Sequence, residues 1–143
     1  GFGFLKDSHF KGFFQDNGNS KPFLNYQVDV KEKIPLMQKH KAKLNTIYQK
    51  GIPSNLHLGK AFENWRFSIL IDNKDDLLKA IFQEKDLFAS SHYVPIDHKY
   101  TDNPIQDSNA HKISSRIINL FNDFRFTEEK AMNVVRVIDN FLE

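Results

Sequence analysis

The chain has 143 residues, enough for one domain or for a domain with an extra arm. Its 20 basic and 18 acidic residues give a net charge of +2, too balanced for the basic surface of a nucleic-acid-binding protein. Cysteine is absent, which excludes disulfides, thiolate nucleophiles and cysteine-ligated metals. An apolar content of 40% with 27% charged residues is typical of a globular protein rather than a disordered one.

The N-terminal segment gives no indication of a membrane or secretory protein. Lys6, Asp7 and Lys11 interrupt any signal-peptide core, and no apolar run reaches the length of a membrane span. We therefore expect a cytoplasmic protein without a membrane partner. Because the chain begins without methionine, we also expect a trimmed chain or a fragment. Residues 1–27 are rich in phenylalanine and turn-forming residues, so we predict an arm there and one domain over 28–143.

The first predicted element is a helix over about 29–50. Asp29 and Glu32 have the spacing of a capping box, although Pro35 could instead mark the first turn. Apolar and aromatic residues recur at three- and four-residue steps on one face, namely Met37, His40, Leu44, Ile47 and Tyr48. Gly51 is expected to end this helix.

Three later segments have the pattern of β-strands: 65–71, 87–94 and 116–121. Bulky apolar residues on both faces of the first indicate a mostly buried strand, and Pro95 would end the second. With helices between and after them, these strands predict an α+β fold. We expect a small antiparallel or mixed three-stranded sheet packed with helices and preceded by the arm and the first helix.

Each later helix has a candidate N-cap. Asn73, Ser108 and Thr127 would cap helices over 74–85, 108–114 and the C-terminal segment, respectively. The stripes expected to face the core are Leu77, Leu78, Ile81 and Phe82 in the first of these helices, and Ala131, Val134, Val135, Ile138 and Leu142 in the last.

One group of polar residues lies at the end of the second strand and the start of a long loop, 96–108, where binding sites are often found. The group comprises Ser90, Ser91, His92, Tyr93, Asp97, His98 and Tyr100. Imidazole exchanges protons near neutral pH, and a tyrosine hydroxyl can hydrogen-bond a polar ligand. The structural alternative is that Tyr93 is a core aromatic residue and His92 a solvent-facing strand residue.

Other kinds of active site have no support in the sequence. The six histidines lack the spacing of zinc ligands, so we expect no metal site. Neither a phosphate-binding loop nor a Gly-x-Ser-x-Gly nucleophile turn is present. We therefore assign no catalytic residue to this chain.

The pieces from Trp65 to Glu143 follow one another in a recognisable order. A strand and a leucine-patterned helix precede Ser91-His92-Tyr93-Val94-Pro95, and an Ile-Ile-Asn-Leu strand precedes Thr127-Glu128-Glu129. This order resembles the C-terminal small domain of the DegT/DnrJ/EryC1/StrS family, the pyridoxal-phosphate-dependent aminotransferases that act on nucleotide-linked keto sugars. In that family, Gly-Ile starts the second strand and His-Tyr-x-Pro ends it. An Ile-Leu-x-Leu-Pro strand and a Thr-Glu-Glu helix follow.

Three positions depart from the family pattern. Asp86 stands where the family has glycine before the second strand, and Phe121 where it has proline after Leu120. Asn25-Tyr26-Gln27 is similar to the family's Asn-Tyr-Arg segment, which reaches a cofactor phosphate in the neighbouring subunit, but Gln27 replaces the arginine.

The resemblance implies that the chain is the substrate-side small domain of an aminotransferase whose catalytic lysine and acidic cofactor partner lie in a large domain. It implies that His92, Tyr93 and His98 bind the nucleotide sugar and that Asn25 meets pyridoxal phosphate. The parent protein would be a homodimeric enzyme, whereas this chain alone would be inactive and bind no cofactor. A non-catalytic, stand-alone α+β module for binding or protein interaction remains the alternative.

Overall fold

A computed structural model of the chain describes residues 23–59, 65–95 and 108–143. The chain divides into two compact units, residues 1–35 and 36–143. The sheet and the helical segments packed on it belong to the second unit. The predicted division into an arm over 1–27 and a domain over 28–143 stays a prediction. In the described part of the chain, no helix is both long enough and apolar enough to pass through a bilayer.

The described elements alternate helices with short strands, which confirms the predicted α+β class. In chain order they are α2 (Phe23–Gly51), the 3-10 helix η1 (Ser54–Leu56), β1 (Phe67–Leu70), α3 (Lys74–Gln83), β2 (Ala89–Ser90), α5 (Asn109–Ser114), β3 (Ile117–Leu120) and α6 (Glu128–Leu142).

The three strands form one antiparallel sheet in the order β1-β3-β2. Leu120 of the central strand lies opposite Phe67 on one side and Ala89 on the other. An isolated bridge joins His57 to Ile69 at the outer edge of β1. There the Leu58 N–H donates to the Ser68 carbonyl at 3.0 Å, so the free edge of β1 is partly covered.

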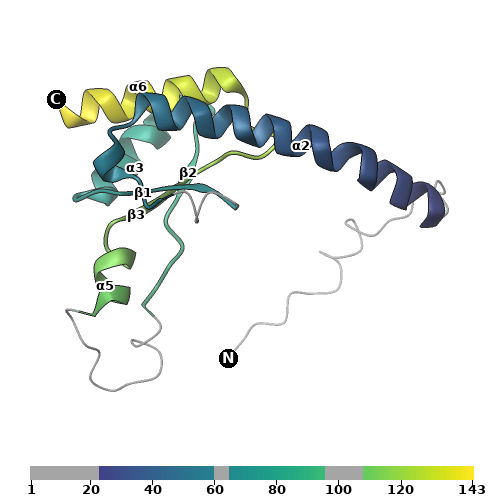
Figure 1. The fold of residues 1–143 in the computed structure, drawn as a ribbon. Helices are drawn as coiled ribbons and strands as arrows, with labels where there is room; N and C mark the ends of the chain where they lie inside the picture. The colour runs from purple at the N-terminus through teal and green to yellow at the C-terminus, as the bar shows by residue number, and fades with distance from the viewer. Residues whose placement is uncertain (1–22, 60–64, 96–107) are drawn as a thin grey trace, which may run out of the picture. The chain divides into compact units, whose positions relative to one another are not determined.

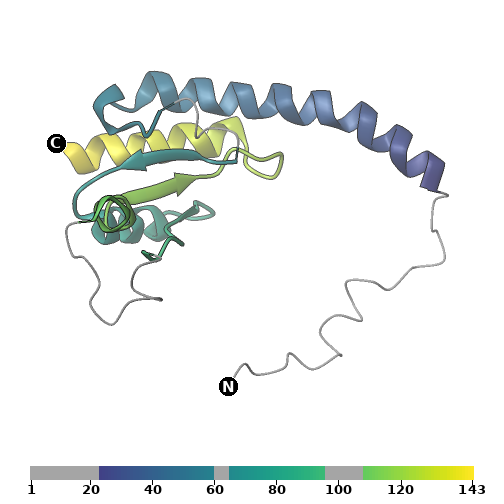
Figure 2. The same ribbon diagram turned by 60° about the horizontal axis from the view of Figure 1, so that its bottom comes forward.

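One face of the sheet forms the core with α3, α6 and the second half of α2. Figures 1 and 2 show these helices beside the strands, with α5 beyond one end of the sheet. The shared core includes Leu44 and Tyr48 from α2, Leu77 from α3, and Val134 and Ile138 from α6. All five side chains are fully or almost fully buried, so this cluster holds the two layers together.

The start of the first helix was predicted wrongly. Helix α2 begins at Phe23, so Asp29 and Glu32 lie inside it and do not form a capping box at its start. Pro35 also lies inside the helix rather than in its first turn. Proline has the φ angle of a helix but no N–H to donate, so one intrahelical hydrogen bond is missing at this position.

The second strand is shorter than predicted, because only Ala89 and Ser90 pair with β3. The predicted stripes need correction at their outermost residues, which lie beyond the packed layer. Met37, Phe82 and Leu142 are exposed, whereas Val137, outside the predicted stripe of α6, is buried.

Two of the three predicted caps are confirmed. The side chains of Ser108 and Thr127 accept hydrogen bonds from the N–H groups of His111 and Lys130, both at 3.1 Å. Asn73 instead takes a left-handed conformation, with φ of 57°, and its side chain caps nothing. Its carbonyl oxygen accepts from the N–H groups that open α3, so the backbone of Asn73 starts the helix.

Candidate functional site

The segment that leaves β2 carries the predicted site residues that the structure describes. Ser90 is buried in the strand and Ser91 is half-buried, whereas His92, Tyr93 and Val94 are exposed. Tyr93 has 47% of its surface accessible, so it is not the core residue of the structural alternative. The chain thus passes from the interior of the sheet to solvent within two residues.

A lysine fixes the point at which this segment leaves the sheet. Lys74, the first residue of α3, donates from its ammonium group to Ser91 Oγ at 3.0 Å and to the carbonyl oxygen of Ser114. It thereby ties the start of α3, the end of β2 and the end of α5 to one another. An ammonium that donates to two fixed acceptors is a strong local constraint, because charge-assisted hydrogen bonds are stronger than neutral ones.

A buried chain of polar groups crosses the sheet just before this point. Ser68 Oγ donates to Asn119 Oδ1 at 2.9 Å, and Asn119 Nδ2 donates to the Ser90 carbonyl oxygen at 3.3 Å. The three residues lie at one level of the register, one on each strand. A slip of any strand by one residue would leave these groups unpaired in the interior, so they fix the register of β2.

The predicted group of polar residues therefore divides into two kinds. Ser90 and Ser91 are structural, since their oxygen atoms accept hydrogen bonds from Asn119 and Lys74. His92 and Tyr93 are adjacent and exposed, and thus accessible to a ligand. Asp97, His98 and Tyr100 lie outside the described residues.

Histidines elsewhere in the described residues have structural surroundings. The His40 ring bonds the carbonyl oxygen of Phe126 at 2.9 Å, and the His57 ring bonds that of Ile52 at 3.0 Å. His57 also packs edge-on against Phe67, with ring centroids 5.1 Å apart. Among the histidines of the described ranges, only His92 is exposed.

The remaining predicted site residue, Asn25, lies in the first turns of α2. It belongs to the unit 1–35, whereas His92 and Tyr93 belong to the unit 36–143. Whether Asn25 meets a cofactor phosphate stays a prediction.

Metal binding finds no support in the described ranges, where no three histidine, aspartate or glutamate side chains gather as ligands. For pyridoxal phosphate, the relevant group would be a lysine amine able to form a Schiff base. The lysine joined to the His92 segment is Lys74, whose amine is occupied by Ser91 and Ser114. The described residues near His92 therefore do not fit the cofactor itself.

Sequence reasoning missed Lys74 and Asn119, the two residues that position the segment. Asn119 had a visible signal, because a polar residue in the middle of the apolar run 116–121 needs a hydrogen-bond partner if it is buried. Lys74 had none, since a lysine in the first turn of a helix is normally solvated. Comparisons with protein-family models, with curated proteins and with solved structures give no match.

Proposed function

We propose that this chain is the small, substrate-side domain of a longer pyridoxal-phosphate-dependent aminotransferase that acts on nucleotide-linked keto sugars. His92 and Tyr93, together with His98, would contact the nucleotide sugar. Asn25 would approach the cofactor phosphate, and the Schiff-base lysine would lie in another domain of the parent, which would act as a cytoplasmic homodimer.

The proposal rests first on the resemblance, and one backbone angle supports it independently. Asp86 has φ of 63°, in the left-handed region that favours glycine. This is the position at which the resembled family has glycine before the second strand. The backbone thus has the conformation that the family's residue would favour, although the side chain differs.

The observation that carries the proposal is the exposure of His92 and Tyr93 directly after an anchored residue. Asn119 holds the carbonyl group of Ser90 and Lys74 holds the hydroxyl group of Ser91, while the next two side chains reach solvent. Polar side chains on a rigidly held strand end can meet a ligand at a low cost in conformational entropy. The exposure of Tyr93 supports the proposal over the structural alternative, in which Tyr93 is a core residue, whereas the exposure of His92 agrees with both.

The two side chains would have different parts in binding. The Tyr93 hydroxyl can donate to a sugar or phosphate oxygen, and its ring can cover the apolar face of a sugar. His92 can donate from either ring nitrogen when protonated, and then also attracts a phosphate. When bound in the parent, pyridoxal phosphate supplies the electron sink for amino transfer, so this chain's residues need only position the sugar.

The presence of the cofactor is tested in the full-length parent protein. Incubation with pyridoxal phosphate should produce the absorbance band of a lysine Schiff base, and borohydride reduction should fix the cofactor to one lysine peptide. A full-length protein without this band would overturn the enzyme proposal and leave the non-catalytic binding module.

The role of the segment is tested by His92→Ala and Tyr93→Ala in the same protein. Each should raise KM for the nucleotide sugar by about threefold to tenfold, the loss of one hydrogen bond, and leave the absorbance band intact. Phe82→Ala, which removes another exposed aromatic ring, is the matched control and should leave KM unchanged. Unchanged KM in both test variants would contradict the assignment.

A further inference from the structure

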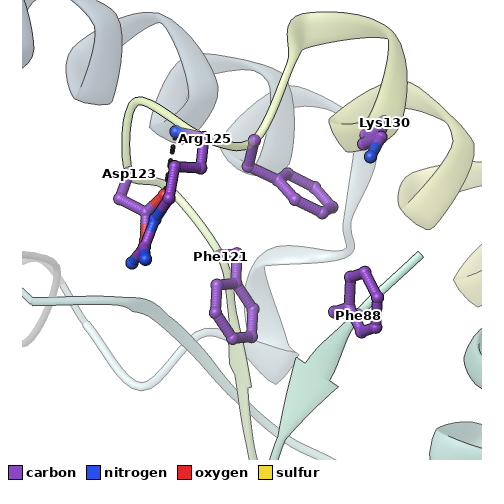
Figure 3. A pocket seen from close by; sticks show the side chains of 6 residues that line it. Phe88, Phe121, Asp123, Arg125 and Lys130 are labelled. Atoms are coloured by element: carbon purple, nitrogen blue, oxygen red, sulfur yellow. Dashed lines mark hydrogen bonds and ion pairs between the residues drawn. The ribbon is translucent and has the colours of Figure 1, made fainter. Parts of the chain in front are cut away.

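A small cavity lies at the end of the sheet opposite to His92. It has a volume of about 210 Å³ and is lined by Phe88, Phe121, Asp123, Arg125, Phe126 and Lys130 (Figure 3). Phe88 precedes the two-residue strand β2 and His92 follows it, so the two residues lie at opposite ends of the strand. The cavity is thus separate from the site proposed above, and its use does not depend on that proposal.

The register of the sheet explains why rings gather here. Phe67 and Ala89 flank Leu120, so one position further out Arg66 and Phe88 flank Phe121. The Arg66 guanidinium lies 4.2 Å from the centroid of the Phe121 ring, in agreement with this extension of the register. The resembled family has proline at the position of Phe121, so the aromatic ring at this side of the cavity distinguishes this chain from the family pattern.

A hydrogen bond from a core residue holds the backbone of Phe121 in place. The buried Tyr48 hydroxyl donates to the Phe121 carbonyl oxygen at 2.7 Å. Burial raises the pKa of Tyr48 far above its ordinary value, against the smaller opposing influence of the Arg66 charge, so this hydroxyl remains a donor. Phe126 packs near Phe121, with ring centroids 6.1 Å apart. The inner rings are therefore held in place, while Phe88 is 52% exposed at the opening.

The charges of the lining favour an anionic ligand. Asp123 is already satisfied: Oδ1 accepts from the Arg125 N–H at 3.0 Å, and Oδ2 accepts from Arg66 at 3.1 Å and from the Arg125 side chain at 3.2 Å. Within the described residues, the Lys130 ammonium has no hydrogen-bond or ion-pair partner. Figure 3 shows the Asp123–Arg125 pair on the side of Phe121 and Lys130 on the side of Phe88. The lining thus offers an unpaired cation beside aromatic faces.

We propose that this cavity binds a single planar ring system that carries a phosphate or a carboxylate. The ring would stack on Phe88 and Phe121, and the anionic group would pair with Lys130. An aromatic cage for an ammonium ligand is the opposite possibility, but Arg125 and Lys130 would repel a cation and Asp123 has no free oxygen to attract it. The volume is below the usual 300–1,000 Å³ of drug-sized sites, which limits the occupant to about one ring system.

The test is a titration of the 143-residue chain, followed by the ¹H–¹⁵N NMR signals of Arg125, Phe126 and Lys130. The probes are AMP and indole-3-acetate. Adenosine and inorganic phosphate are the half-ligands of AMP, and indole and acetate are those of indole-3-acetate. AMP, indole-3-acetate or both should bind with a dissociation constant of about 1 mM or lower, roughly tenfold tighter than either half-ligand. Binding of AMP alone assigns phosphate as the anionic group, and binding of indole-3-acetate alone assigns carboxylate.

Two variants locate the binding. Phe88→Ala should weaken it by roughly fivefold or more through loss of stacking. Lys130→Gln should weaken it by about threefold to tenfold through loss of the ion pair. Phe82→Ala and Lys112→Gln are the controls, since they remove an equally exposed ring and an exposed lysine that do not line the cavity. The proposal is overturned if AMP and indole-3-acetate cause no saturable shift, if a half-ligand binds as tightly as the whole probe from which it is taken, or if controls and test variants weaken binding equally.

Discussion

At the scale of single residues, the most constrained side chain is Asn119. It is 1% exposed and joins all three strands through Ser68 Oγ and the Ser90 carbonyl oxygen. Its amide fills two roles that an apolar side chain cannot, because it accepts on one side and donates on the other. Replacement by alanine would leave both neighbouring groups unpaired in the interior.

We therefore expect Asn119→Ala to lower the free energy of unfolding by about 2–4 kcal/mol, the combined cost of two broken hydrogen bonds. Urea denaturation followed by circular dichroism measures this change. Asn140→Ala, at an exposed position of α6, is the control and should change stability by less than about 0.5 kcal/mol. An equally small loss in Asn119→Ala would show that the hydrogen-bonded chain does not fix the sheet.

Asp123 gives the molecule a defined dependence on pH. Burial alone would raise the pKa of this carboxyl group, but hydrogen bonds from Arg125 and the charges of Arg125 and Arg66 lower it below its usual value. As the pH falls past about 3.9, the ordinary value for aspartate, the unfolded chain binds a proton at this residue before the folded chain does. The stabilisation that the ionised Asp123 gives to the folded chain is therefore complete above a pH of about 3.9. It is lost as the pH falls through the pKa of Asp123 in the folded chain.

Asp123→Asn should accordingly be less stable than the unsubstituted chain near pH 7, and the difference should shrink at acid pH. Chemical denaturation at several pH values between about 2 and 7 measures it. Asp139→Asn controls for the loss of one exposed carboxylate. A difference that stays constant across the acid range would refute the ion-pair assignment.

At the scale of elements, the close approach of α2 and α6 depends on Gly51. A Cβ atom at this position would lie 2.4 Å from Val135 Cγ1, closer than two carbon atoms can pack. Lys43 of α2 also pairs with Glu128 of α6 at 3.2 Å, but both side chains are exposed and the pair contributes little. The fit between the two helices thus depends mainly on the missing side chain.

Gly51→Ala should lower the free energy of unfolding by about 1–3 kcal/mol through overpacking, although alanine is the better helix former. Val135→Ala in the same chain should recover part of that loss, which a double-mutant cycle measures by thermal or chemical denaturation. Strictly additive effects of the two substitutions would mean that the helices do not meet at these residues.

Elements with a local physical cause could be predicted from the sequence. The side-chain oxygens of Thr127 and Ser108 accept a hydrogen bond from the backbone N–H three positions later. The starts of their helices were therefore predicted correctly. The apolar segments around Phe67 and Ile117 likewise predicted paired strands. The start of α2 was missed because the helix continues through Pro35. The length of β2 was missed because it depends on pairing with β3, which is distant in sequence and reaches only Ala89 and Ser90.

At the scale of the whole molecule, the sequence located a candidate site but not its supports. His92 and Tyr93 were selected as chemically versatile residues at a strand end, and the structure finds both exposed. The anchors at Lys74 and Asn119, and the Arg66–Asp123 pair beside the cavity, arise from contacts between residues 17 to 57 positions apart. Such contacts leave no periodic signal in a single sequence, because the partners are joined only by the fold.

The central claim is that the segment after β2 contacts a nucleotide-linked sugar in the parent protein. Hydrogen–deuterium exchange of the full-length protein with pyridoxal phosphate, with and without a nucleotide-linked keto sugar, tests it most directly. We expect the sugar to slow exchange in peptides that contain His92, Tyr93 and Val94, with no change in peptides from the middle of α6. Slower exchange elsewhere in the parent protein, with none at residues 91–94, would contradict the claim.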